Sequence, residues 1–479
     1  MSQLTLDRYL FAGVNELANW LREGKTSATE LAELALLALQ ERAVPLNSVA
    51  NLAPARAARE AARAAREAAR ADEALKSGKT GGPLQGIPYG AKDLLATADG
   101  LPTTWGAVPF KDQQFNEDAT AVRLLAEAGA TLTAKLSMVE LAGGMGYNQP
   151  NASLQGPGKN PWNPQRWTGG SSSGSAAAVA CGALPFALGS ETWGSILSPA
   201  SYCGVVGFRP TYGTVSRHGA MALSWSLDKI GPYARSAEEC ARVMEVIGVP
   251  DSLDPTSNGR RFQYRPAEYQ NRRWRFGLLE TEVEVAGGAI AQNIQQAIKS
   301  LEKIGTVETI SLSPDLPYGE VASIILFAEA AAAFDEFMAE GRLEELTAPE
   351  DHINPFVYEV VLAKDYIRAL RIRGKIMRHM ADLLSEVDFI VGPSTSTTAV
   401  PLDQTFPQSM GPKRRLGLSA ASNLAGLPAI SLPSGLDEQG LPTGMQLVGG
   451  AYSDEAVLVA AATIEKMLPP LDRSRLNRA

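Results

Sequence analysis

The chain has 479 residues, of which 45% are hydrophobic and 20% are charged, and its formal net charge is −8. This composition is typical of a globular protein with a large buried core. The acidic balance, with an isoelectric point near 5.3, argues against a nucleic-acid-binding protein, because such a protein needs a basic face.

The first 80 residues are predicted to form an N-terminal helical region. Residues 55–76 are a run of Ala, Arg and Glu, which are strong helix formers. An alanine stripe is expected to pack this helix against the protein. A basic helix lying on a membrane is the alternative. It is disfavoured because acidic residues intersperse the arginines and no large apolar residue precedes Leu75. A glycine turn over 78–82 is predicted to end the region.

The segment from 85 to 235 is rich in Gly, Ser, Ala and small apolar residues. Its short runs predict alternating strands and helices, in chain order at 86–91, 121–129, 131–134, 173–182 and 184–188. This alternation predicts a layered α/β fold.

A polar stretch over 250–273 predicts a long loop. Beyond it the pattern predicts, in chain order, a strand at 274–280, a helix at 289–305, a strand at 306–312, helices near 318–341 and 360–385, and strands at 388–392 and 429–432. These later elements have the same α/β texture as the earlier ones. We therefore expect a single domain over 1–479, in which 250–385 forms a variable lobe around the substrate pocket.

Cysteine and histidine are scarce in this sequence. The cysteines Cys181, Cys203 and Cys240 fit neither a disulfide framework nor a metal-binding CxxC site. The three histidines occur in no HxxxH or HExxH pattern, so we expect neither a metal nor another cofactor. The chain starts without the segments of a signal peptide and has no apolar run of ~20 residues. We therefore expect a cytoplasmic protein with no membrane partner.

Three short segments carry the candidate catalytic residues. The first, GIPYGAKD, places Lys92 at the end of an apolar strand. The second, GGSSSGS, places Ser171 just before an alanine-rich helix. The third, GSETWGSILSP, contains Ser195, which lies 24 positions after Ser171.

In this order and spacing the three segments resemble the amidase signature family. That family has a lysine in GIPxxxKD, a bridging serine at the start of GGSSxGS, and a nucleophilic serine 24 positions later. The segments CGVVGFRPTYGTVS, SLDKIGP and NLAGLPAISLP are also similar to the family, so the resemblance covers most of the chain. It implies a single α/β/α domain around a large, mixed, twisted sheet, with residues 85–235 as the signature core.

The resemblance implies a Ser-Ser-Lys triad. Ser195 is the expected nucleophile and Lys92 the expected base. Ser171 is the expected relay between them, because a hydroxyl group accepts and donates a proton at once. The resemblance also implies that the peptide bond between Gly170 and Ser171 is cis.

The chemistry of serine explains why the lysine must be unusual. Serine is a weak nucleophile that needs a base, and an exposed lysine with a pKa of ~10.4 is protonated at neutral pH. Burial lowers a lysine pKa by up to ~3–5 units. Lys92 lies among apolar neighbours such as Tyr89 and Leu94, so we expect it to be buried and neutral. The alternative is a surface lysine paired with Asp93 or another carboxylate.

The oxyanion hole is expected from the backbone N–H groups of Trp193, Gly194 and Ser195, with Thr192 nearby. Here the sequence departs from the family pattern, because many members have Gly at the position of Trp193 and Arg at the position of Leu197. The indole of Trp193 is expected either to shape the pocket or to pack outward. Leu197 removes a cation near the nucleophile, which favours a small neutral substrate, aromatic ones included.

The function that this resemblance implies is hydrolysis of a C–N acyl bond in an amide, anilide or carbamate, with esterase side activity. The protein is expected to work through an acyl-enzyme as a monomer or homodimer. One alternative is the glutamine-hydrolysing subunit of a tRNA amidotransferase, which SLDKIGP and NLAGLPAISLP also resemble. A non-catalytic member of the fold is the other, and the intact triad residues disfavour it.

Two further motifs are decoys. GSSSG matches the GxSxG elbow of α/β-hydrolases with Ser172 as nucleophile, but no histidine has a supporting context. SLDK, from Ser226 to Lys229, matches an SxxK motif without the SDN that should follow. The middle third offers side chains for the pocket wall, with ordinary core as the alternative: Phe327, Phe334, Phe337, Met338, Phe356 and Tyr358.

Overall fold

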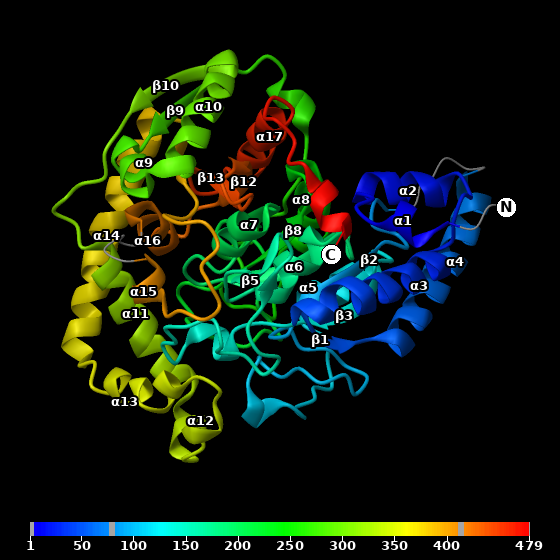
Figure 1. Cartoon of the computed structure of the whole chain (residues 1–479), viewed down its shortest axis with the longest axis horizontal. Helices are drawn as coiled ribbons and strands as arrows, with labels where there is room; N and C mark the ends of the chain where they lie inside the picture. Colours follow the sequence, from blue (N-terminus) through cyan, green and yellow to red (C-terminus); the bar gives the residue numbers. More distant parts are fainter. Residues whose placement is uncertain (1–3, 76–81, 411–415, 479) are drawn as a thin grey trace.

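One large mixed sheet organises the protein (Figure 1). The computed structural model describes residues 4–75, 82–410 and 416–478, and within them eleven strands form this sheet. In spatial order the strands are β1 (Val49–Leu52), β3 (Thr131–Leu136), β2 (Pro88–Lys92), β6 (Phe186–Glu191), β8 (Lys229–Ala234), β7 (Val206–Arg209), β12 (Ala429–Leu436), β13 (Pro442–Gly449), β11 (Phe389–Pro393), β9 (Trp274–Leu278) and β10 (Gly305–Thr309). A separate pair is formed by β4 (Lys159–Asn160) and β5 (Asn163–Trp167).

Helices surround the sheet in Figure 1, and the predicted α/β fold is confirmed. The helices of the described residues are α1 (Leu6–Tyr9), α2 (Val14–Arg22), α3 (Ala28–Ala38), α4 (Pro54–Leu75), α5 (Thr120–Glu127), α6 (Ser173–Ala180), α7 (Leu197–Cys203), α8 (Ala237–Ile247), α9 (Glu280–Ala286), α10 (Gly288–Ile304), α11 (Tyr318–Ala333), α12 (Asp335–Ala339), α13 (Asn354–Tyr358), α14 (Ala363–Glu386), α15 (Phe406–Met410), α16 (Gly417–Leu424) and α17 (Asp454–Glu465). None of these helices is both long enough and apolar enough to cross a bilayer.

The neighbouring strands β2 and β6 place the first and third sequence motifs side by side. They run parallel, with Tyr89 opposite Phe186 and Ala91 opposite Leu188. The rings of Tyr89 and Phe186 stack with their centroids 5.2 Å apart, and both are fully buried. Parallel strands end at the same edge of a sheet. The carboxyl ends of the two strands therefore meet there, and Lys92 is the last residue of β2.

The N-terminal region differs from its prediction in one respect. The helix predicted at 55–76 is present as α4, but the first 80 residues also contain β1, which pairs antiparallel with β3. The four residues of β1 are of mixed polarity and give little strand signal in the sequence. The strand is stabilised by its pairing with the buried strand β3. The turn predicted over 78–82 lies mostly outside the described residues.

The alanine stripe of α4 packs on α3, as predicted. Its buried members Ala57, Ala61 and Ala64 meet Ala28 and Ala32 of α3. Small side chains on both helices allow their backbones to approach closely, so this face is covered by protein rather than free to meet a membrane.

The loop predicted over 250–273 contains one short 3-10 turn, Pro266–Tyr269. The strands that follow it, β9 and β10, join the same sheet through β11. The helix predicted at 318–341 is broken at Phe334 into α11 and α12, because that residue has a non-helical ψ of 17°.

Candidate active site

Lys92 is buried at the end of β2 beside two serine hydroxyls. Its side chain has no exposed surface. The Nζ atom lies 2.7 Å from Oγ of Ser171 and 2.9 Å from Oγ of Ser190. Ser190 belongs to β6, so the parallel strand pair fixes one of the two contacts and the loop before α6 fixes the other.

The surroundings of Lys92 favour its uncharged form. Burial lowers the pKa of Lys92 from its usual 10.5 to about 7, although the carboxylates of Asp228 and Glu191 act in the opposite direction. Near neutral pH a large fraction of this amine is therefore neutral and has a lone pair available. A neutral amine has two N–H bonds and one lone pair. When one N–H bond donates to Oγ of Ser190, the lone pair can face Oγ of Ser171.

The serine-rich loop is held against the backbone of β3 and its continuation. The Gly170–Ser171 peptide bond is cis, as expected, and the carbonyl of Ser171 accepts a hydrogen bond from the N–H of Val139. A Cβ atom at Gly174 would lie 2.2 Å from the carbonyl oxygen of Ser48, so only glycine fits at this start of α6. GGSSSGS is thus an ordered loop that positions Ser171.

Ser195 lies in a tight turn between β6 and α7, and Glu191 holds this turn. Oε2 of Glu191 accepts hydrogen bonds from the N–H groups of Ile196 and Leu197, at 2.8 and 3.0 Å. Oε1 forms a fully buried ion pair with Arg209 at 2.6 Å. Burial opposes this charge, but Arg209 and other neighbouring groups lower the pKa of Glu191 to about 2. A permanently charged carboxylate therefore fixes the residues that follow Ser195.

The backbone around Ser195 offers two free donors. The N–H groups of Gly194 and Ser195 find no acceptor among the described residues, and Gly194 has a φ of +87°, which suits glycine. The hydroxyl of Thr192 donates to Asp228 at 2.5 Å, so its side chain is already engaged. Trp193 lies in the pocket wall, so its indole does not pack outward.

The structure brings Lys92 and Ser171 into hydrogen-bonding contact, but it shows no hydrogen bond from Oγ of Ser195 to either residue. Ser195 is 9% exposed and lines the pocket beside Gly170. Catalytic hydrogen bonds are often long in an empty site and tighten when substrate is bound.

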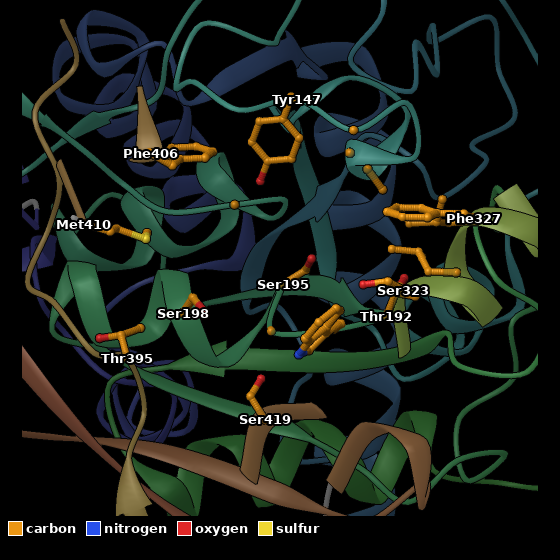
Figure 2. A pocket seen from close by; sticks show the side chains of 18 of the residues that line it. Tyr147, Thr192, Ser195, Ser198, Ser323, Phe327, Thr395, Phe406, Met410 and Ser419 are labelled. Carbon is orange, nitrogen blue, oxygen red and sulfur yellow. The ribbon is translucent and has the colours of Figure 1, made fainter. Parts of the chain in front are cut away.

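A pocket of about 490 Å³ opens onto Ser195 (Figure 2). Figure 2 shows Phe406 and Met410 on one side of Ser195, Phe327 and Ser323 on the other, and Tyr147 above it between the two groups. The described residues that line it include aromatic and hydroxyl side chains: Tyr147, Trp167, Trp193, Tyr202, Phe327, Tyr358, Phe406, Ser198, Ser323, Ser394, Thr395, Ser396 and Ser419. No charged side chain occurs among the described lining residues.

Only part of this wall was predicted. Phe327 and Tyr358 line the pocket and stack with centroids 4.3 Å apart. The other predicted wall residues do not line it: Phe334, Phe337 and Met338 are buried in the core, and Phe356 is exposed. No sequence pattern points to Tyr147, Trp167 and Phe406, because they come from loops and short segments without a repeating pattern.

Leu197 does not face the pocket, so its identity does not indicate a neutral substrate, contrary to the prediction from the sequence. Leu197 is 2% exposed, belongs to the hydrophobic core and does not line the pocket. The absence of an arginine at this position therefore bears on core packing. The evidence on substrate charge is the described part of the pocket wall, which carries no charged side chain.

The serine of the GxSxG match and the lysine of the SxxK match form hydrogen bonds to other parts of the core. Oγ of Ser172 donates to the carbonyl of Ser190, and Nζ of Lys229 donates to Asn423. His352 and His379 contact backbone groups at Leu346 and Ser313. In the part of the chain that the structure describes, no three His, Cys, Asp or Glu side chains come together as a metal site would need.

Known proteins resemble this chain over nearly its whole length. A model of the Amidase family matches residues 35–458. One subunit of the glutamyl-tRNA(Gln) amidotransferase of Lachnospira eligens is 35% identical over 486 residues, covering 94% of this chain and 97% of the relative. The solved structure of the corresponding subunit from Thermotoga maritima is 28% identical with a TM-score of 0.77, covering 98% and 99% of the two chains. The peptide amidase from Stenotrophomonas maltophilia is 26% identical with a TM-score of 0.80, covering 96% and 99%.

The Glu191–Arg209 pair yields a stability prediction. Replacing Glu191 with Gln leaves the guanidinium of Arg209 buried without its counter-charge, which should lower the free energy of unfolding by about 3–5 kcal/mol. Chemical unfolding at pH 7 measures this. The control is Glu345→Gln, which breaks an exposed pair with Arg342 and should leave the unfolding midpoint nearly unchanged. Equal midpoints for the two variants would contradict the structural role of Glu191.

Proposed function

This chain belongs to the amidase signature family, whose members hydrolyse C–N bonds, and we propose that it cleaves a small neutral amide, anilide or carbamate with Ser195, Ser171 and Lys92. The observation that carries the proposal is the 2.7 Å contact between a buried Lys92 and Ser171. It supports a base that is neutral near pH 7 and is joined to a hydroxyl that can pass a proton.

The proposed acylation begins at Ser195. Its Oγ attacks the substrate carbonyl carbon while its proton passes to Oγ of Ser171, which gives its own proton to Nζ of Lys92. The carbonyl oxygen becomes an oxyanion, and the N–H groups of Gly194 and Ser195, which have no acceptor among the described residues, are the proposed donors to it. The C–N bond then breaks, and the proton returns through Ser171 to the leaving nitrogen.

The proposed deacylation repeats these roles with water as nucleophile. Water attacks the ester carbonyl of the acyl-Ser195 intermediate and gives its proton through Ser171 to Lys92. The C–O bond to Ser195 breaks, and the serine oxygen recovers a proton by the same route. The acid and free Ser195 result, and no group other than water is consumed.

The part of the pocket wall that the structure describes carries no charge, which supports a neutral substrate. A carboxylate or ammonium group leaves water at a cost of several kcal/mol and needs an opposite charge in the site. The described wall offers only aromatic, aliphatic, hydroxyl and amide groups. Aromatic walls with a few hydroxyls suit an aryl or alkyl amide with one or two hydrogen-bonding groups.

The second candidate is glutamine hydrolysis, as in the amidotransferase subunits that this chain resembles at 35% identity. Glutamine carries both an ammonium and a carboxylate group, so a site for it needs two charged partners. The described wall supplies neither, and this is why the neutral substrate is preferred.

The triad predicts a graded loss of activity. Ser195→Ala should lower kcat by about 10⁴-fold or more, and Ser171→Ala and Lys92→Met should leave residual activity at most. A fluorophosphonate should label the wild-type chain on Ser195, as located by mass spectrometry. Labelling on Ser172 would favour the GxSxG interpretation, and a Ser195→Ala variant with normal kcat would refute the assignment. A correctly folded chain that neither reacts nor turns over any substrate would indicate a non-catalytic member.

The lack of charge in the described pocket wall predicts that neutral substrates have a higher kcat/KM than charged ones. Steady-state kinetics should give kcat/KM for a neutral p-nitroanilide or aryl carbamate at least about 100-fold above that for L-glutamine. A matched pair isolates charge: the same anilide with a carboxylate added to its acyl chain should be cleaved far more slowly than its methyl ester derivative. Glutamine hydrolysis at a rate equal to or above that of every neutral amide would contradict the proposal.

A further inference from the structure

An apolar surface lies beside the pocket, around α13 and the start of α14. Six large hydrophobic side chains in this short stretch are 55–69% exposed: Ile353, Phe356, Val357, Val360, Leu362 and Ile367. We call them the 353–367 patch. Single exposed hydrophobic residues are normal, but six within fifteen positions mark an interaction surface.

A row of cations continues from this patch along α14. Lys364, Arg368, Arg371, Lys375 and Arg378 are spaced by four, three, four and three residues, and all are exposed. At about 100° per residue this spacing places them within one arc of roughly 80° on the helix. The opposite side of α14 is the buried one, with Ala369, Ile376 and Met380. The cation row therefore faces outward, and α14 lies along the edge of the molecule with α13 at one end (Figure 1).

These cations are largely uncompensated. Lys364 pairs with the adjacent Asp365, whereas the other four have no carboxylate partner among the described residues. The only other acidic residue between 353 and 378 is Glu359. The surface over 353–378 is thus net positive on a chain whose net charge is −8, and the next carboxylate on this face of α14 is Asp382, beyond Arg378.

We infer that the 353–367 patch and the cation row together dock on an anionic phospholipid bilayer. Phe356, Val360 and Leu362 would enter the interface between head groups and acyl chains, and the cation row would contact lipid phosphates. A second copy fits less well, because a two-fold contact across this face would set the cation row against itself. Peripheral docking of this kind is an alternative to the expectation, drawn from the sequence, of no membrane partner.

Cosedimentation of the full chain with vesicles tests the inference. The vesicles are pure phosphatidylcholine, or phosphatidylcholine with about 30% phosphatidylglycerol. One variant is Phe356→Ser/Val360→Ser/Leu362→Ser, which spares Val357 because it lines the pocket. Another is Arg368→Gln/Arg371→Gln/Lys375→Gln. Its matched control is Lys111→Gln/Lys299→Gln/Lys303→Gln, which removes three exposed cations from elsewhere on the surface.

The expected result is binding to the anionic vesicles that weakens at least tenfold in both patch variants and is unchanged in the control. Binding that the serine variant leaves intact would show charge attraction without insertion and would overturn the inference. Equal losses in the control, or no vesicle binding at all, would also overturn it. If the chain sediments as a dimer that the serine variant makes monomeric, the face belongs to a second copy and the lipid assignment fails.

Discussion

The site depends on one interaction, the contact between Nζ of Lys92 and Oγ of Ser171 in a place closed to water. Keeping an ammonium ion there is costly, and the fall of the Lys92 pKa from 10.5 to about 7 corresponds to roughly 5 kcal/mol. The folded-state pKa lies below the unfolded one, so this cost is fully present below pH 7 and vanishes as the pH rises towards 10.5. The proposed mechanism uses the neutral form of this destabilising lysine as its base.

Comparison with two other buried lysines shows what distinguishes Lys92. Burial lowers the pKa of Lys135, but its Nζ lies 3.0 Å from a carboxylate oxygen of Asp93. Burial also lowers the pKa of Lys229, whose Nζ donates to the side-chain amide of Asn423. Lys92 instead meets two hydroxyl groups. Desolvation is common to all three, and the identity of the partner distinguishes Lys92, the proposed base, from Lys135 and Lys229.

The two carboxylates near Lys92, those of Glu191 and Asp228, bind other groups and do not pair directly with the lysine. Glu191 is occupied by Arg209, Asn423 and the N–H groups that begin α7. Asp228 accepts from Thr192 and from the backbone of Leu223 and Ser224. Glu191 thereby holds the backbone that follows Ser195, and Asp228 joins the side chain of Thr192 to the backbone at 223–224. The same network that fixes the turn containing Ser195 thus keeps a carboxylate from pairing directly with Lys92.

Much of the fold could be predicted from the sequence, because α10 and α14 have helical periodicity and β3 and β11 are short apolar runs. The strands β7 and β8 could not, since Val206–Arg209 and Lys229–Ala234 contain Arg, Lys, Gly and Pro, which are typical of loops. Their charges are tolerated in the core because Arg209 meets Glu191 and Lys229 meets Asn423. The resemblance to the amidase signature motifs implied the Lys92–Ser171 contact, whereas pocket residues such as Phe406 and Ser419 come together only through tertiary packing.

The most direct test of the account is the protonation state of Lys92 in the folded enzyme. Nitrogen-15 NMR of lysine-labelled protein, with Lys92→Met to assign the signal, follows the Nζ resonance through a pH titration. The account predicts a midpoint near pH 7, so that this amine is uncharged at about pH 8.5 while exposed lysines remain protonated. A midpoint near the usual value of 10.5 would contradict it, because Lys92 would then be a cation throughout the working range and unable to accept a proton from Ser171.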